Sequence, residues 1–138
     1  MAIENTGGDM FVIGTLPLAT AANLAGKSLI TVAGAAPANA ARAVFGVISR
    51  DTPSGDLADV KLPGSIVEVI ATGAVTKGAQ VEVLQGTVYA NINGTSTSTT
   101  SAGVQDLASG YPIGLALTGS DAYGTVQVLL YGNQGKSA

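Results

Sequence analysis

The sequence contains no cysteine, no histidine and no tryptophan. Without thiols it can form neither a disulfide framework nor a thiolate metal site. Without imidazole it lacks the general base of Ser-His-Asp and Cys-His catalytic systems, and it also lacks the commonest ligand of zinc. We therefore expect a protein that is not an enzyme and that holds no catalytic residues, no metal and no other cofactor.

Charged residues are also scarce. They make up 11% of the 138 residues, with a net charge of -3, whereas an average soluble domain has about 25%. The six basic residues are scattered singly along the chain, so no basic patch is predicted that would hold a phosphate backbone. A surface with so little charge is usually covered in part by other copies or by a partner. The composition predicts an assembly component that does not bind nucleic acid directly.

An apolar stretch from Met10 to Ala25 is the only candidate for a targeting or membrane segment. Glu4 and Asp9 precede it, where a secretory signal carries positive charge. Gly14 and Pro17 interrupt it, well short of the roughly 18 apolar residues that a membrane helix needs. We expect a protein made in a cytoplasm, with no membrane partner.

Alternation of apolar and polar residues predicts β-strands. Val67 and Val69 flank Glu68, and the same period of two recurs at 80–84 and 125–130. Shorter apolar runs predict further strands at 29–32, 44–48, 87–92 and 113–117. Since no segment shows a helical period over more than two turns, the chain is predicted to be all-β. About eight short strands in a small antiparallel β-barrel or sandwich are expected, with long loops.

Glycine, proline and asparagine separate these segments and predict turns. The expected turns lie at 52–56, 62–64, 76–78, 85–86, 93–94 and 119–121. Asn93-Gly94 predicts a tight hairpin turn.

Three stretches do not fit the strand pattern: residues 1–22, the Ala-rich run Ala33 to Ala43, and the Ser/Thr-rich run Gly94 to Gly103. We predict an extended N-terminal arm at 1–22, a β-rich domain at 23–132 and a flexible C-terminal tail at 133–138. The Ser/Thr run is predicted to be a surface loop because it has little apolar surface to bury. Contact with a glycan or a host receptor is the alternative for that run.

Two short motifs have a chemical interpretation and a structural one. Gly26-Lys27-Ser28 matches the end of a phosphate-binding loop, but Ala21 stands where the first glycine is required. Asp51-Thr52-Pro53 has Pro53 where the aspartic-peptidase loop needs glycine, and a polar turn explains it better. Asp51, Asp56 and Asp59 form a weak candidate for calcium, because their spacing matches no EF-hand loop.

Segments of the chain resemble the head-decoration, or capsid cement, proteins of tailed bacteriophages, the broad group that includes the lambda-type decoration proteins. The similar segments are residues 23–32, 44–56, 73–81, 113–117 and 124–130. Each motif is short, and the order and spacing of the motifs carry the resemblance. The residues that match the family pattern are Asn23, Leu24, Val32, Gly46, Val47, Gly55, Gly78, Gly114 and Gly124. Gln80 departs from it, and the insertions at 33–43 and 91–103 are longer than the pattern requires.

The resemblance implies a function in binding rather than in catalysis. Such proteins form homotrimers on the outer surface of the expanded head and stabilise the capsid, so the implied partner is the major capsid protein. The implied location is the exterior of the virion, after synthesis in the bacterial host cytoplasm. An N-terminal arm commonly reaches onto the shell in this family. The candidate capsid contacts in such an arm are its apolar and β-prone side chains: Ile3, Met10, Phe11, Val12 and Ile13.

A carbohydrate-binding or receptor-binding β module is the alternative function, because it would also be neutral, β-rich and oligomeric. Sugar-binding sites usually expose aromatic rings, and the chain has no Trp and two Phe. A hydrolase that relies on carboxylates alone is the third and least favoured class.

Overall fold

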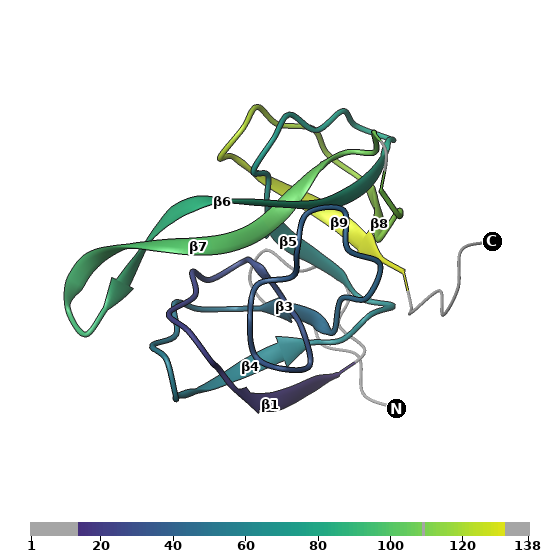
Figure 1. Cartoon of the computed structure of the whole chain (residues 1–138). Helices are drawn as coiled ribbons and strands as arrows, with labels where there is room; N and C mark the ends of the chain where they lie inside the picture. The colour runs from purple at the N-terminus through teal and green to yellow at the C-terminus, as the bar shows by residue number, and fades with distance from the viewer. Residues whose placement is uncertain (1–13, 109, 132–138) are drawn as a thin grey trace.

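The computed structural model describes residues 14–108 and 110–131. Strands and turns account for all the regular structure of these residues, without a helix, which confirms the all-β prediction (Figure 1). The strands in chain order are β1 (Thr15–Ala19), β2 (Leu29–Ile30), β3 (Gly46–Ile48), β4 (Leu57–Lys61), β5 (Ile66–Ile70), β6 (Gln80–Ile92), β7 (Thr95–Asp106), β8 (Gly114–Ala116) and β9 (Thr125–Leu130).

All nine strands of the described residues belong to one antiparallel sheet, in the order β1-β4-β3-β2-β7-β6-β8-β9-β5. The sheet is open, because the edge strands β1 and β5 are not neighbours. It is nevertheless strongly curled. Ala71, just after β5, forms an isolated parallel bridge with Val104 in β7, and the Thr72 amide donates to the Val104 carbonyl at 3.1 Å. The half of the sheet from β7 to β5 therefore bends back on itself (Figure 1).

The larger apolar core fills this curled half and follows the alternation predicted from sequence. Val67 and Val69 of β5 pair directly with Val128 and Val126 of β9, and all four are almost completely buried. Burial of one such side chain is worth about 1.5 to 3 kcal/mol. The same cluster contains Leu29, Val47, Val81, Val83, Val104, Ile113 and Leu130.

A second, smaller core lies at the other end of the sheet. It consists of Leu24, Ile30, Ile48, Ala58 and Val60, and the half-buried side chains packed against it are Leu18, Ala36 and Phe45. The residues of this cluster come mainly from the β2, β3 and β4 region. Leu18 packs β1 against this core, whereas the 33–43 loop packs against both cores through Ala36 and against the larger one through Ala41.

The Ser/Thr-rich run is a strand, so the prediction of a loop there is wrong. Each residue of β7 from Thr95 to Asp106 pairs with a residue of β6 from Val81 to Ile92. β-branched threonine suits an extended backbone, and the backbone ladder supplies the stability that apolar burial does not. The predicted turn at 85–86 is also wrong, because both residues lie inside β6. The hairpin turn at Asn93-Gly94 is confirmed by φ values of 53° and 84°, as a type I′ turn requires.

The boundary of the predicted N-terminal arm also needs correction. β1 pairs with β4 from Thr15↔Lys61 to Ala19↔Leu57, so residues 14–22 belong to the folded domain. The sequence did not predict this strand because it contains Pro17, but proline is tolerated in an edge strand. Residues 1–13 and the predicted tail at 133–138 lie outside the described residues. The 33–43 run contains no strand and is a loop, as predicted.

Candidate functional site

Within residues 14–108 and 110–131, no three His, Cys, Asp or Glu side chains come together in a way that could hold a metal ion. The same residues contain no helix of the length and apolar character that would cross a membrane. The candidate sites of these residues are single polar groups and apolar surfaces.

Asp51 connects two parts of the fold. Its Oδ1 accepts a hydrogen bond from the Gly26 amide, and its Oδ2 accepts one from the Asn91 amide, both at 2.8 Å. The Asp51 carboxylate therefore ties the turn after Leu24 to the far end of β6. This arrangement supports the interpretation of Asp51-Thr52-Pro53 as a polar turn, and Asp51 is a structural residue.

We expect Asp51→Ala to lower the free energy of unfolding by about 2 to 3 kcal/mol, because it leaves two backbone amides without their acceptor. Urea denaturation measures the effect. Asp56→Ala is the matched control: Asp56 is exposed, and its substitution should change stability by no more than about 0.5 kcal/mol. Equal effects of the two substitutions would show that the Asp51 contacts contribute nothing specific.

Gly26-Lys27-Ser28 forms a tight turn in place of a phosphate-binding loop. Lys27 has a φ of 63°, and its Nζ lies 3.2 Å from Oε1 of Glu68. The Ser28 hydroxyl donates to the Ala25 carbonyl at 2.5 Å. The cation and the hydroxyl that would serve a phosphate are thus engaged within the fold.

Glu82 is the most unexpected polar residue of the structure. The alternation of 80–84 predicts that Glu82 faces outward, yet only 3% of its surface is exposed. Its Oε1 accepts from the amides of Gly110 at 2.7 Å and Ala108 at 3.2 Å, and its Oε2 accepts from Nε2 of Gln105 at 2.8 Å. All three donors belong to the end of β7 and the segment that follows it. Glu82 therefore anchors this segment, and nothing in the local sequence spacing indicates that role.

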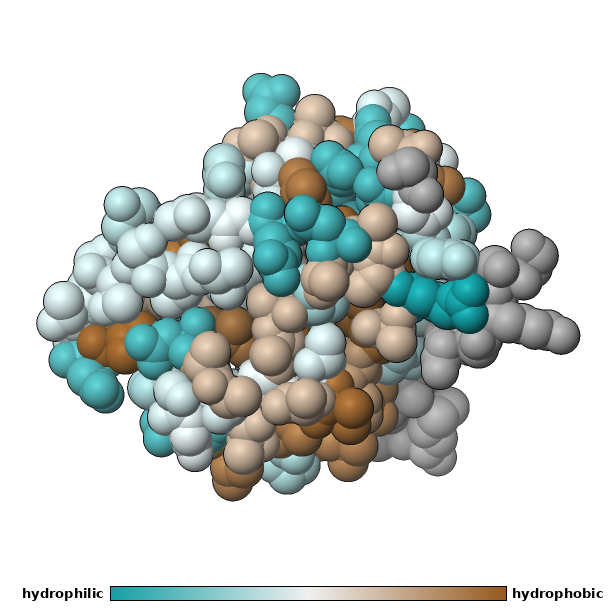
Figure 2. Space-filling view, in the orientation of Figure 1, coloured by the Kyte–Doolittle hydropathy of each residue, from teal (hydrophilic) through white to brown (hydrophobic). Residues whose placement is uncertain are grey.

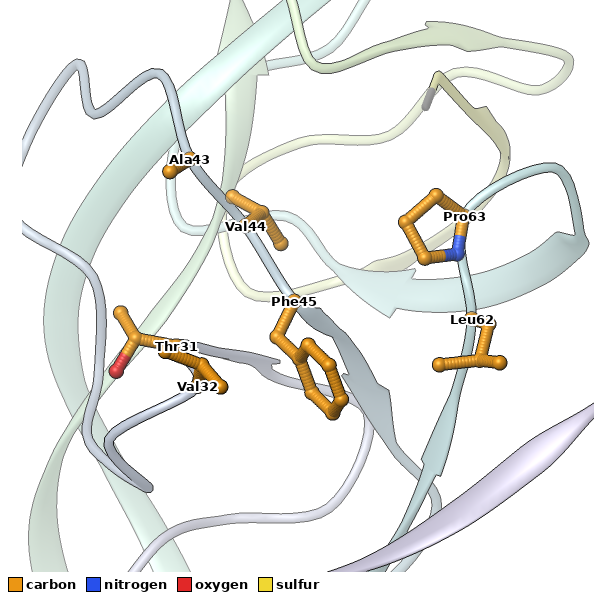
Figure 3. A pocket seen from close by; sticks show the side chains of 7 residues that line it. All are labelled: Thr31, Val32, Ala43, Val44, Phe45, Leu62 and Pro63. Carbon is orange, nitrogen blue, oxygen red and sulfur yellow. The ribbon is translucent and has the colours of Figure 1, made fainter. Parts of the chain in front are cut away.

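An apolar groove lies in the described part of the chain. It has a volume of about 540 Å³ and is lined by Thr31, Val32, Ala43, Val44, Phe45, Leu62 and Pro63. Figure 3 shows the Phe45 ring between the side chains of Val32 and Leu62, with Val44 and Pro63 above these three in the view. The volume is within the range of ligand sites, but among the described lining residues Thr31 supplies the only side-chain hydroxyl. The groove is suited to apolar side chains and not to a polar substrate.

The chain enters the described domain at the rim of this groove. The amide of Leu62, a lining residue, donates to the carbonyl of Gly14 at 3.2 Å, and β1 begins at the next residue. The predicted capsid-contact residues lie upstream of this point and outside the described residues: Ile3, Met10, Phe11, Val12 and Ile13. The groove and the attachment point of the predicted arm are therefore adjacent.

The surface around the groove is apolar, whereas the β6–β7 hairpin is not. Figure 2 shows hydrophobic surface gathered below the hairpin, over the end of the sheet that holds β1, β3 and β4. Val32 is 70% exposed at the groove, and Leu16 of β1 is 46% exposed. The hairpin is covered mainly by weakly polar residues in the same view. Tyr89 of β6 presents a large aromatic ring that is 71% exposed.

The residues that match the family pattern are distributed through the fold and do not form one site. Asn23 accepts a hydrogen bond from the Ser54 amide at 2.8 Å through its side-chain oxygen, and Leu24 and Val47 are buried in the two cores. Val32 lies beyond the end of β2, at the groove. Among these four residues, only Val32 faces a candidate binding surface.

The matching glycines serve turns and close packing. Gly55 and Gly78 have φ values of 90° and 87°, which an L-residue adopts only with strain. A Cβ at Gly46 would lie 2.5 Å from Cγ1 of Val60, and one at Gly114 would lie 2.5 Å from Cγ1 of Val128. At Gly124 a Cβ would overlap with the Ser120 hydroxyl. These glycines are explained by the fold and indicate no chemistry.

No family model matches the sequence, and none of the curated proteins matches it either.

Proposed function

We propose that this chain is a structural virion protein that binds the outer surface of an expanded phage head as a homotrimer and stabilises the capsid. The observation that carries the proposal is the apolar groove at the point where the N-terminal segment joins a β-sheet domain with few charged residues. Such a domain offers apolar surface for binding to another protein. The described residues contain no cluster of side chains that could hold a metal ion.

The N-terminal residues provide the contact with the major capsid protein in this proposal. Ile3, Met10, Phe11, Val12 and Ile13 are apolar and β-prone, which suits strand addition to an open sheet edge of the shell. A ligand that binds only the assembled, expanded shell stabilises that state by mass action. Trimerisation strengthens attachment, since the second and third arms bind intramolecularly once the first is bound.

The test is to mix the purified protein with undecorated expanded heads of the phage that encodes it and to measure occupancy by cryo-electron microscopy and sedimentation. We expect density at the three-fold positions of the head. Deletion of residues 1–13 should weaken binding by at least about 100-fold, because three tethered contacts are lost at once. The deletion must stop at residue 13, since β1 begins at Thr15.

A matched variant that replaces Met10, Phe11, Val12 and Ile13 by serine keeps the length of the segment and removes its apolar character. It should bind as weakly as the deletion, while circular dichroism shows the β-structure of the wild type. Unchanged occupancy of either variant would contradict the arm's role. No binding of the full chain, or a monomeric mass in light scattering at micromolar concentration, would contradict the proposed function itself.

Recognition of a carbohydrate or receptor is the second candidate, and one surface favours it. On one face of the β6–β7 hairpin, the exposed ring of Tyr89 lies directly opposite Ser98, with Thr87 and Thr100 as the next pair on that face. An aromatic ring among hydroxyl groups is a common arrangement for contact with a sugar. Glycan binding that Tyr89→Ala abolishes, together with no uptake onto heads, would favour this function over the first.

A further inference from the structure

The second core is covered incompletely at the groove. Phe45 packs against the buried cluster of Leu24, Ile30, Ile48, Ala58 and Val60, yet Val32 beside it is 70% exposed. On β1, Leu16 and Leu18 lie opposite Val60 and Ala58 of that cluster. An apolar hollow of about 540 Å³ next to a core leaves unfavourable apolar surface in water. Another apolar segment in the groove would shield this surface of the second core from water.

The pairing of β1 with β4 ends at the rim of this hollow. The register Thr15↔Lys61 is followed upstream by the hydrogen bond from the Leu62 amide to the Gly14 carbonyl. Side chains two residues apart share one face of a strand. A continuation of β1 beyond Gly14 would therefore place positions 12 and 10 on the face of Leu16 and Leu18. Four further residues would span roughly 13 Å, a length suited to a groove of this size.

The sequence of that continuation fits the lining of the groove. Met10-Phe11-Val12-Ile13 is a run of four apolar residues directly before Gly14, and six of the seven lining residues are apolar. None of the described residues that line the groove is charged, so an apolar segment would bury none of their charge there. Because the segment is attached at the rim, its local concentration at the groove exceeds that of any separate molecule.

We propose that the groove is the docking site of the chain's own segment Met10–Ile13, which prolongs β1 past Gly14 and seats Met10 and Val12 against Val32, Phe45 and Leu62. This inference concerns the isolated protein and does not rest on the proposed function. If the same segment also contacts a phage head, the groove and the shell compete for it, and the segment leaves the groove on attachment.

Crosslinking tests the proposal cleanly, because the chain has no cysteine of its own. The variant Val12→Cys/Val32→Cys is treated with a short bis-maleimide and compared with Val12→Cys/Leu57→Cys. Leu57 is 58% exposed and lies at the other end of β4 from Leu62. We expect a crosslink within one chain, formed at least about tenfold faster than in the control pair. Equal rates would overturn the proposal, and so would crosslinks that join two chains, which would assign the groove to a second copy.

A second measurement tests the orientation of the segment and does not depend on the cysteine variants. Val12→Asp should lower the urea midpoint of unfolding, because it places a carboxylate in the apolar groove. Ile13→Asp is the matched control on the adjacent position, because the proposed extension of β1 would turn that side chain to the other face, and it should leave the midpoint within error of the wild type. A midpoint that is unchanged in Val12→Asp, or lowered equally in both variants, would overturn the proposal.

Discussion

Gly103→Ala is expected to lower the free energy of unfolding by about 3 kcal/mol, as severe overpacking of a core does. A Cβ at this position of β7 would overlap with the carbonyl oxygen of Ile70 and would lie 2.8 Å from Cγ2 of the same residue. Ile70 ends β5, and Ala71 makes the bridge that draws the end of β5 against β7. The side chain would therefore push apart the two strands whose approach gives the sheet its curl.

Urea denaturation followed by circular dichroism measures this loss. Gly14→Ala is the matched control, since a Cβ there meets nothing within 4 Å, and it should change stability by less than about 0.5 kcal/mol. We further expect faster hydrogen exchange at the Thr72 amide in Gly103→Ala, because that amide donates across the same junction to Val104. Wild-type stability of Gly103→Ala would mean that β5 and β7 do not approach as described.

Glu82→Ala is expected to have an effect of similar size, about 3 kcal/mol, because it removes the acceptor of several hydrogen bonds inside the protein. The amides of Ala108 and Gly110 would lose their partner, and so would the side-chain amide of Gln105. Burial of the site keeps water from replacing the carboxylate easily. The segment after β7 should therefore detach locally, with the fastest exchange at the Gly110 amide.

Glu82→Gln separates the charge of this side chain from its shape. Glutamine keeps one acceptor oxygen for the backbone amides but loses the charge-assisted part of the bonds, so we expect a loss of about 1 kcal/mol. The order wild type, Glu82→Gln, Glu82→Ala in urea midpoints would support the anchoring role. If Glu82→Ala unfolded at the wild-type midpoint, the three hydrogen bonds would contribute no net stability.

The strands that the sequence predicted well are those whose alternation reflects burial on one face. Val67 and Val69 pair with Val128 and Val126 in the core, so local pattern and tertiary packing agree there. The Ser/Thr run fails this criterion, since its stability comes from the ladder with β6. Its buried hydroxyls act together: Thr99 donates to the Val88 carbonyl at 2.8 Å, and Ser101 accepts from the Ala25 amide at 3.1 Å. The hydropathy of the Ser/Thr run does not reveal these hydrogen-bond partners, because they lie outside the run in the sequence.

The candidate site was less predictable than the fold for the same reason. The groove is lined by residues from three separate stretches, 31–32, 43–45 and 62–63, and their proximity depends on the β2–β3 and β3–β4 pairings. Sequence reasoning placed Val32 and Val44 within strands, whereas both lie outside the strand ends. Glu82 was predicted to face solvent. It is buried because a segment more than 20 residues away in the sequence covers its face of the strand.

The position of Pro17 has a consequence for how copies of this chain behave when they are crowded. The amides of Leu62 and Thr20 pair with Gly14 and Asp56 across the β1–β4 ladder, so the even-numbered residues of β1 bond toward β4. Backbone amides of odd-numbered residues then point to the open edge, and Pro17 has none. An incoming strand would find a gap in the middle of that edge, which discourages open-ended fibril growth. Two copies that meet at their β1 edges would therefore pair poorly through this strand.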